Sequence, residues 1–199
     1  MKTLYESLLD DFDTMSASST TDIKNEIKQF LKDNYKKSSS FEISRKPNND
    51  GYYEVDCSKC SDIEVGNKNI TSLTNNLFIF VNIKGDFDCS YCRNLTSLEG
   101  APEEIVGDFY CTYCNKLTSL KGAPKEVGKH FYCNNCSNLT SLKGSPKEIK
   151  HVFDLTNCIN IKSLEGAPKK VRTWYSLENV QSFDEYDIRK VCSVTKIIT

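Results

Sequence analysis

The sequence has little of what exported, membrane-bound or strongly charged proteins carry. Acidic and basic residues almost balance, at a formal net charge of −1 over 199 residues. This balance gives no global attraction to nucleic acid or to anionic lipid. The most apolar run, at residues 77–81, has the length of a strand and is far too short to span a membrane. We therefore expect no membrane association.

Catalytic motifs are scarce as well. The only two histidines, His130 and His151, accompany no serine or cysteine nucleophile motif, and no glycine-rich loop joins a strand to a helix. We predict that the protein is not an enzyme and needs no cofactor. Glu6 and Asp10 lie within the first apolar stretch, so we expect no secretory signal and a cytoplasmic location.

The chain is dominated by a 22-residue unit that occurs three times almost unchanged between residues 95 and 160. The copies read LTSLEGAPEEIVGDFYCTYCNK, LTSLKGAPKEVGKHFYCNNCSN and LTSLKGSPKEIKHVFDLTNCIN. So short a unit cannot bury its own apolar face. A fixed period of this size therefore predicts supersecondary units stacked on one another.

Apolar residues recur at fixed positions of the unit and define the predicted core. The Phe-x-Cys alternation predicts a short strand with both side chains facing inward. The Gly-Ala-Pro turn leads into a return segment that is too short for a helix. Three of the six aligned core positions hold Phe87, Phe109, Phe131, Phe153 and Tyr175; then Cys89, Cys111, Cys133, Leu155 and Leu177; then Cys92, Cys114, Cys136, Cys158 and Val180.

The ten cysteines have three interpretations. Where a repeat lacks cysteine it carries leucine or valine, which cannot bind a metal, so we predict buried, metal-free thiols that pack as small hydrophobes. The CxxC pairs also match a zinc-ribbon pattern, and the alternative ligands are Cys89, Cys92, Cys111 and Cys114. A disulfide within one CxxC is the third interpretation, but thiols in apolar surroundings are inert.

The unit resembles a known repeat family. Written as V-G-D-F-Y-C-T-Y-C-N-K-L-T-S-L (residues 106–120), it is similar to the leucine-rich repeat with cysteine at the Asn/Cys position. Over about residues 55–185 the chain resembles short-unit arrays of large tailed bacteriophages and gut bacteria, which are mostly interaction proteins. The resemblance implies an α+β fold: a curved leucine-rich-repeat solenoid with a parallel β-sheet on its concave face, an N-terminal helical segment and a β-hairpin cap.

The sequence divides into four predicted parts. Residues 1–37 form an N-terminal helical segment, which either caps the first repeat or docks elsewhere. Residues 38–62 form the β-hairpin cap, with PNNDG as its turn, and the first irregular repeat. Residues 63–182 form the leucine-rich repeats, and residues 183–199 a C-terminal cap. The helix face is expected at Ile23, Ile27, Phe30, Leu31 and Tyr35, and the C-terminal closure at Phe183, Tyr186, Ile188 and Val191.

The residues that flank the buried pair on each strand are expected on the concave face. This face carries more aromatic residues than solubility requires, and Tyr and Trp dominate the hot spots of protein interfaces. The alternative is that aromatic ladders only stiffen stacked strands. The predicted partner-binding residues are Tyr91, Tyr110, Tyr113, His130, Tyr132, Asn134, Asp154 and Trp174.

We therefore predict a non-enzymatic module that binds a protein partner through its concave aromatic face. The phage resemblance adds a specific version: a phage-encoded inhibitor or adaptor that acts on a host defence protein in the host cytoplasm. One alternative is a zinc-stabilised CxxC protein that contacts nucleic acid through a basic strip, the excess of lysine and arginine between Lys116 and Arg172 that includes Lys147, Lys150 and Lys169. The other is a structural scaffold whose specificity lies in the N-terminal segment. The sequence favours a protein partner over nucleic acid. No pattern in it indicates an oligomeric state.

Overall fold

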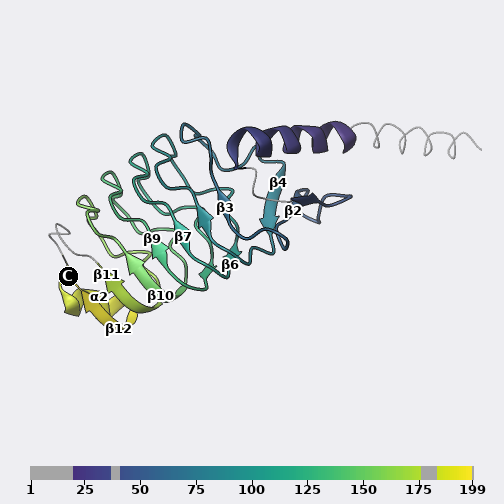
Figure 1. Cartoon of the computed structure of the whole chain (residues 1–199). Coiled ribbons are helices and arrows are strands. Elements are labelled where there is room, and N and C mark those ends of the chain that lie inside the picture. The colour runs from purple at the N-terminus through teal and green to yellow at the C-terminus, as the bar shows by residue number, and fades with distance from the viewer. Residues whose placement is uncertain (1–19, 37–40, 176–182, 199) are drawn as a thin grey trace, which may run out of the picture.

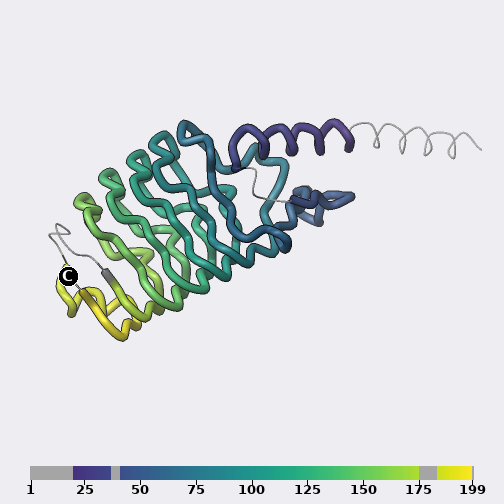
Figure 2. Tube along the Cα trace, in the orientation of Figure 1, coloured from purple at the N-terminus to yellow at the C-terminus, as the bar shows by residue number. Residues whose placement is uncertain are grey.

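The computed structural model describes residues 20–36, 41–175 and 183–198. The chain winds into a β-solenoid of about six turns, and Figures 1 and 2 show its coils stacked side by side. Most of the strands join one parallel sheet. In spatial order they are β3 (Ile63–Glu64), β5 (Phe87–Asp88), β7 (Phe109–Tyr110), β9 (Phe131–Tyr132), β10 (Glu148–Asp154), β11 (Lys170–Tyr175) and β12 (Ser193–Ile198).

The strand register places equal positions of successive repeats next to one another. Phe87 pairs with Phe109, Phe109 with Phe131, and Phe131 with Phe153. The return segments form a second row, in which β6 (Glu104–Ile105) pairs with β8 (Glu126–Val127), and β8 pairs with the first half of β10. The prediction that the return segments are not helical is confirmed.

The core consists of columns of identical side chains. The rings of Phe87 and Phe109 stack at 5.7 Å, and those of Phe109 and Phe131 at 4.9 Å. All three side chains are fully buried. Burial of one such ring contributes about 1.5–3 kcal/mol, so the stacked repeats supply the core that a single repeat lacks.

The Gly-Ala-Pro turns require glycine because successive repeats approach closely there. Gly122 has φ +85, and a Cβ atom on it would lie 2.2 Å from the backbone nitrogen of Glu99 in the preceding repeat. No other residue fits this backbone conformation and this contact without strain.

A helix covers the start of the array (Figure 1). It runs over residues 20–34, with Ile27 and Leu31 buried, and the ring of Phe30 lies 5.8 Å from that of Phe78. The Tyr35 hydroxyl, just after the helix, donates a hydrogen bond of 2.6 Å to the carbonyl oxygen of Leu73. The predicted apolar helix face is confirmed. The apolar stretch that includes Glu6 and Asp10 lies outside the described residues.

Beneath this helix lies a three-stranded sheet. Strands β1 (Glu42–Ile43) and β2 (Tyr53–Asp56) form the predicted antiparallel hairpin, and β2 pairs in parallel with β4 (Phe78–Val81). This sheet therefore joins the hairpin to the solenoid.

The C-terminal end closes differently from the prediction. Helix α2 (Glu185–Val191) begins with a capping box between Asp184 and Asp187, and Ile188 is buried beneath it. Tyr186 was expected in the closure but is 73% exposed, because it lies on the solvent side of α2. Strand β12, which the sequence pattern did not indicate, then adds to β11 in parallel.

Parts of the sequence interpretation stay predictions. The structure is a β-solenoid with a parallel sheet and two short helices. The leucine-rich-repeat class, the curvature, the α+β assignment and the four domain boundaries remain expectations. The proposed core residues Leu177 and Val180 lie outside the described residues.

Candidate functional site

The outer positions of the short strands carry the first group of predicted binding residues. Tyr110 on β7 and Tyr132 on β9 alternate with buried phenylalanines and are half-buried themselves. Their rings stack at 5.0 Å with 12° between the planes. The ring of His130 stacks on that of Tyr132 at 5.4 Å and lies 5.3 Å from that of His151. We call Tyr110, Tyr132 and His130 the strand stack.

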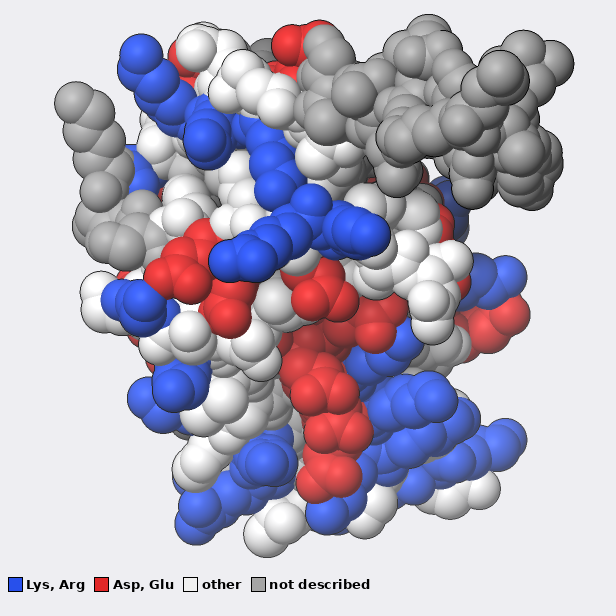
Figure 3. Space-filling view, turned by 90° about the vertical axis from the view of Figure 1, so that its right-hand side faces the viewer, with Lys and Arg blue, Asp and Glu red and all other residues white. Residues whose placement is uncertain are grey.

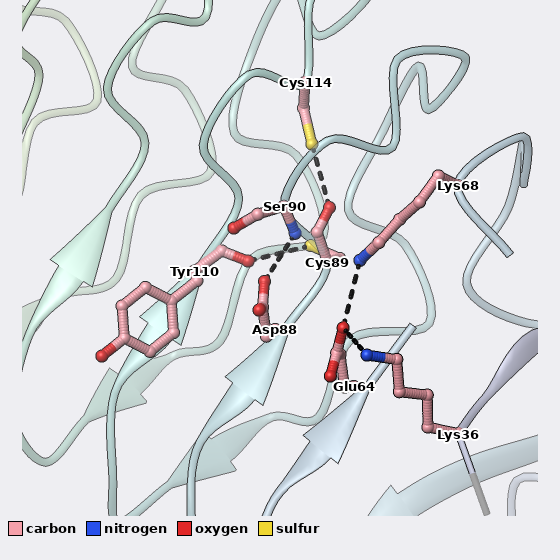
Figure 4. A network of polar contacts seen from close by, with 8 residues as sticks. All are labelled: Lys36, Glu64, Lys68, Asp88, Cys89, Ser90, Tyr110 and Cys114. Carbon is pink, nitrogen blue, oxygen red and sulfur yellow. Dashed lines mark hydrogen bonds and ion pairs between the residues drawn. The ribbon is translucent and has the colours of Figure 1, made fainter. Parts of the chain in front are cut away.

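The Tyr110 hydroxyl is held by a neighbour on the same strand segment. It donates a hydrogen bond of 2.8 Å to Oδ2 of Asp108. Burial, and after it the adjacent Asp108 carboxylate, raises the pKa of Tyr110 above its ordinary value. The phenol therefore stays protonated, while its ring points away from the polar contacts around Cys89 (Figure 4).

A second stack lies at the turn that follows each strand. The rings of Tyr91 and Tyr113 stack at 4.9 Å with 10° between the planes, and the two residues are 50% and 37% exposed. We call this pair the turn stack. The single aromatic strip predicted from the sequence is therefore two stacks, one on the strands and one at the turns.

The backbone of the turn stack is strained. Tyr91 has φ 63 and Tyr113 φ 57, whereas the equivalent residues of the next two repeats are Asn135 and Asn157, both at φ 60. Asparagine tolerates this left-handed conformation, but a bulky side chain in it is an outlier that costs about 1–2 kcal/mol. The asparagines also form a ladder, in which Nδ2 of Asn157 donates to Oδ1 of Asn135 at 3.0 Å.

The free-energy cost of the strained backbone exceeds the stabilisation that the stacked rings provide. Two strained tyrosines cost roughly 2–4 kcal/mol, whereas one stacked aromatic pair contributes about 0.5–1.5 kcal/mol beyond its burial. Stability alone favours asparagine at these positions.

Comparison of the chain with protein-family models, with curated proteins and with solved structures finds no match. The geometry of the surface therefore carries the functional argument. Among the described residues, no helix has the length and apolarity that a membrane span requires.

Two further predicted residues lie beside the stacks, and both take part in hydrogen bonds with the backbone. Asp154 pairs with Tyr132 in the strand register, and its Oδ1 accepts a hydrogen bond of 2.8 Å from the backbone nitrogen of Thr156. Asn134 is half-buried, and its carbonyl oxygen accepts from the backbone nitrogen of Tyr113 at 3.1 Å.

The prediction that Trp174 faces the partner is wrong. Val171 lies 22 residues after its partner Ile149, but Trp174 lies only 21 after its partner Phe153, because the register shifts between Ile149 and Val152. Trp174 therefore takes the phenylalanine position that the sequence alignment gave to Tyr175. It is 1% exposed, and its ring meets that of Phe153 edge-on at 5.0 Å.

A row of aspartates that was not among the predicted site residues has a defined geometry. Oδ1 of Asp62 accepts a hydrogen bond of 2.9 Å from the backbone nitrogen of Asp86. In the next repeat, Oδ1 of Asp86 accepts one of 2.7 Å from the backbone nitrogen of Asp108. Oδ1 of Asp108 accepts from the backbone nitrogen of His130 at 2.9 Å. The alignment of Asp86 with Asp108 was the signal that could have revealed this ladder.

The cysteines form a ladder of their own inside the solenoid. Sγ of Cys114 donates to the carbonyl oxygen of Cys89 at 3.2 Å, and Cys136 and Cys158 make the same bond to Cys111 and Cys133. Figure 4 shows the first of these contacts. All ten cysteines are buried thiols outside any disulfide, and Leu155 occupies the equivalent of Cys133 with 1% exposure.

Burial controls the ionisation of most of these thiols. It raises the pKa of Cys89 and Cys111 well above the ordinary value, and that of Cys92 to about 12. Hydrogen bonds donated by Cys111 and Cys158 would lower the pKa of Cys136 to about 6. In the observed geometry, however, Sγ of Cys136 itself donates to a carbonyl oxygen inside the core, which favours the neutral thiol.

Three of the four cysteines named as alternative zinc ligands, Cys89, Cys111 and Cys114, lie in this ladder, and Cys92 is fully buried as well. In the part of the chain that the structure describes, no three or more His, Cys, Asp or Glu side chains group so that they could hold a metal ion. Packed, metal-free thiols remain our prediction, and a chelation experiment tests it.

The basic strip belongs to a different surface. Figure 3 looks onto the side seen at the right of Figure 1, where acidic side chains form a central column with lysine and arginine side chains on both sides. In the strand register Glu104 is next to Glu126, and Glu126 is next to Glu148, which pairs with Lys170 at 2.7 Å. An open groove of about 680 Å³ lies along these strands, lined in part by Lys84 and Lys150. Acidic and basic side chains share this surface, so it has no single sign of charge.

Proposed function

We propose that the protein is a non-enzymatic module that binds a protein partner through the strand stack and the turn stack. The observation that carries the proposal is the turn stack. Tyr91 and Tyr113 keep a strained backbone at positions where the next two repeats carry the better-suited asparagine. Strain that the fold does not require concentrates at functional sites.

The chemistry of the two stacks suits protein recognition. Tyrosine offers a large, rigid ring at a low cost in conformational entropy, together with a hydroxyl for hydrogen bonding. Here the rings are already stacked before a partner arrives, so little ordering is left for the binding step.

The specific version of this function rests on the phage resemblance of the repeat unit. In that version the module is an inhibitor or adaptor that acts on a host defence protein in the host cytoplasm. No residue of the two stacks distinguishes this version from other protein-binding roles.

The experiment is a selection of displayed random peptides on the immobilised protein. The bound peptides are then tested against the double variant Tyr91→Asn and Tyr113→Asn, which gives both positions the residue that their own repeat family uses. The matched control makes the same change at Tyr52 and Tyr186, which are exposed elsewhere.

The proposal predicts peptides that bind the wild type and the control but not the turn-stack variant. Peptides that bind all three proteins equally would place the recognition surface elsewhere and refute the proposal.

A further inference from the structure

We propose that the partner presents a cationic, extended segment to the two stacks, with arginine or lysine side chains between the tyrosines and the aspartates. This inference rests on the proposed function, because it names the chemistry of the segment that the same surface takes. It follows from the charges that surround the stacks.

Two neighbouring rows of outward positions run across the strands beside the stacks. The first row holds Asp62, Asp86, Asp108 and His130, and the second holds Glu64, Asp88, Tyr110, Tyr132 and Asp154. Neither row contains a lysine or an arginine, although the chain has 26 of them. The outward positions beside the tyrosines therefore carry acidic side chains and no lysine or arginine.

Part of this charge is already neutralised. Glu64 forms ion pairs with Lys36 at 2.6 Å and with Lys68 at 3.7 Å, and Figure 4 shows both. These pairs lie at the β3 end of the rows. The acidic surface beside the tyrosines consists of Asp86, Asp88 and Asp108.

The fold does not require negative charge at these positions. Asp86 and Asp108 each accept a backbone hydrogen bond from the next repeat, and Asp88 accepts one of 2.7 Å from the backbone nitrogen of Ser90. An asparagine side-chain oxygen would accept the same bonds. Like charges on neighbouring strands, which lie about 4.8 Å apart, destabilise a sheet. Repulsion between the carboxylates therefore lowers the stability of the fold, and a bound cationic ligand would relieve this repulsion.

The dimensions suit an extended segment that crosses the strands. From β3 to β10 the rows take four steps of about 4.8 Å, or roughly 19 Å, which an extended chain covers in about six residues. A guanidinium group can lie against a tyrosine ring and pair with a carboxylate at the same time. Asp108 and Tyr110, joined by their hydrogen bond, provide both groups within one repeat.

The test uses defined peptides. Fluorescence anisotropy measures the binding of a short labelled peptide of alternating arginine and threonine, and of the same peptide with glutamate in place of arginine. The proteins are the wild type, the variant Asp86→Asn with Asp108→Asn, and a control in which Glu99→Gln and Glu165→Gln make the same change of net charge. The two control residues pair with Lys121 and Lys143 away from these rows. A labelled single-stranded oligonucleotide provides the anionic comparison.

We expect the arginine peptide alone to bind the wild type. Its affinity should fall roughly tenfold in the aspartate variant and stay within about twofold in the control. Equal affinity for the aspartate variant, equal binding of the glutamate peptide, or no binding of the arginine peptide to the wild type would each overturn the inference. The comparison of the two peptides on the wild type needs no variant to fold.

The displayed-peptide selection separates this failure from that of the proposed function. Selected peptides that are neutral or acidic and lose binding in the turn-stack variant would support the proposed function. They would refute the inference that the bound segment is cationic. Binding of the oligonucleotide in preference to every peptide would refute both.

Discussion

Replacing the turn stack by asparagine should stabilise the protein. The double variant Tyr91→Asn and Tyr113→Asn relieves a backbone strain of roughly 2–4 kcal/mol. It gives up a stacked pair worth about 0.5–1.5 kcal/mol and some half-buried ring area, worth about 1 kcal/mol. It also extends the amide ladder that begins at Asn135 and Asn157. We expect a net gain of about 1 kcal/mol in the free energy of unfolding, which raises the Tm by about 2–4 °C in a chain of this size.

The assay is urea unfolding followed by circular dichroism, with thermal melting as a second measurement. The reciprocal variant, Asn135→Tyr with Asn157→Tyr, introduces the strain and should lower the free energy of unfolding. The reasoning fails if the asparagine variant loses 1 kcal/mol or more, because the tyrosines would then be a structural ladder and their conformation would need no functional explanation.

Three other perturbations test the architecture. Burial raises the pKa of Cys192 to about 11 and that of Cys92 to about 12, above about 8.5 in the unfolded chain. The unfolded state therefore loses protons first as the pH rises. The free energy of unfolding should be constant below about pH 8 and fall toward pH 11 by up to about 1.4 kcal/mol per pH unit for each thiol; a flat urea-midpoint profile would show that the thiols ionise alike in both states. Trp174→Ala should leave a cavity in the core and lower the free energy of unfolding by about 3–5 kcal/mol. The fluorescence of the single tryptophan in the wild type should resist quenching by iodide. Strong quenching would show that Trp174 is exposed. Deletion of residues 1–14 should leave the Tm unchanged. Deletion of residues 1–37 should cause aggregation, because it uncovers Phe78 and the sheet beneath the helix; light scattering and melting compare the two, and equal tolerance would show that the helix caps nothing.

The sequence predicted the parts of the fold that repeat. Phe87, Phe109 and Phe131 recur at one position, and identical neighbours can share a register only if the repeats stack in parallel. The helix face at Ile27 and Leu31 and the hairpin at residues 41–57 were predicted from local patterns, and the structure confirms them.

The predictions that failed depend on irregularity. Trp174 lies in the core because the last described repeat is one residue shorter between its two halves, and a strict 22-residue alignment therefore places Trp174 and Tyr175 one position off. Strand β12 pairs with β11 although its sequence, SVTKII, does not resemble the unit. Such a pairing depends on the open sheet edge that β11 provides, and a local pattern does not contain this information.

Part of the candidate site could also be predicted, because its residues recur at equal positions of the repeat. The repeat gives Tyr91 and Tyr113 equal positions in successive units, but their strain depends on the backbone angle φ, which the sequence does not show. The aspartate ladder likewise became visible only when the carboxylate of one repeat met the backbone nitrogen of the next.

The most direct test of the binding surface is a ratio of dissociation constants. A peptide selected on the wild type is titrated against the wild type, the turn-stack variant Tyr91→Asn/Tyr113→Asn and the control variant Tyr52→Asn/Tyr186→Asn. An aromatic hot spot contributes about 2 kcal/mol or more, so the Kd should rise at least about 30-fold in the turn-stack variant and stay within about twofold in the control. A turn-stack variant that binds as tightly as the control would contradict the account.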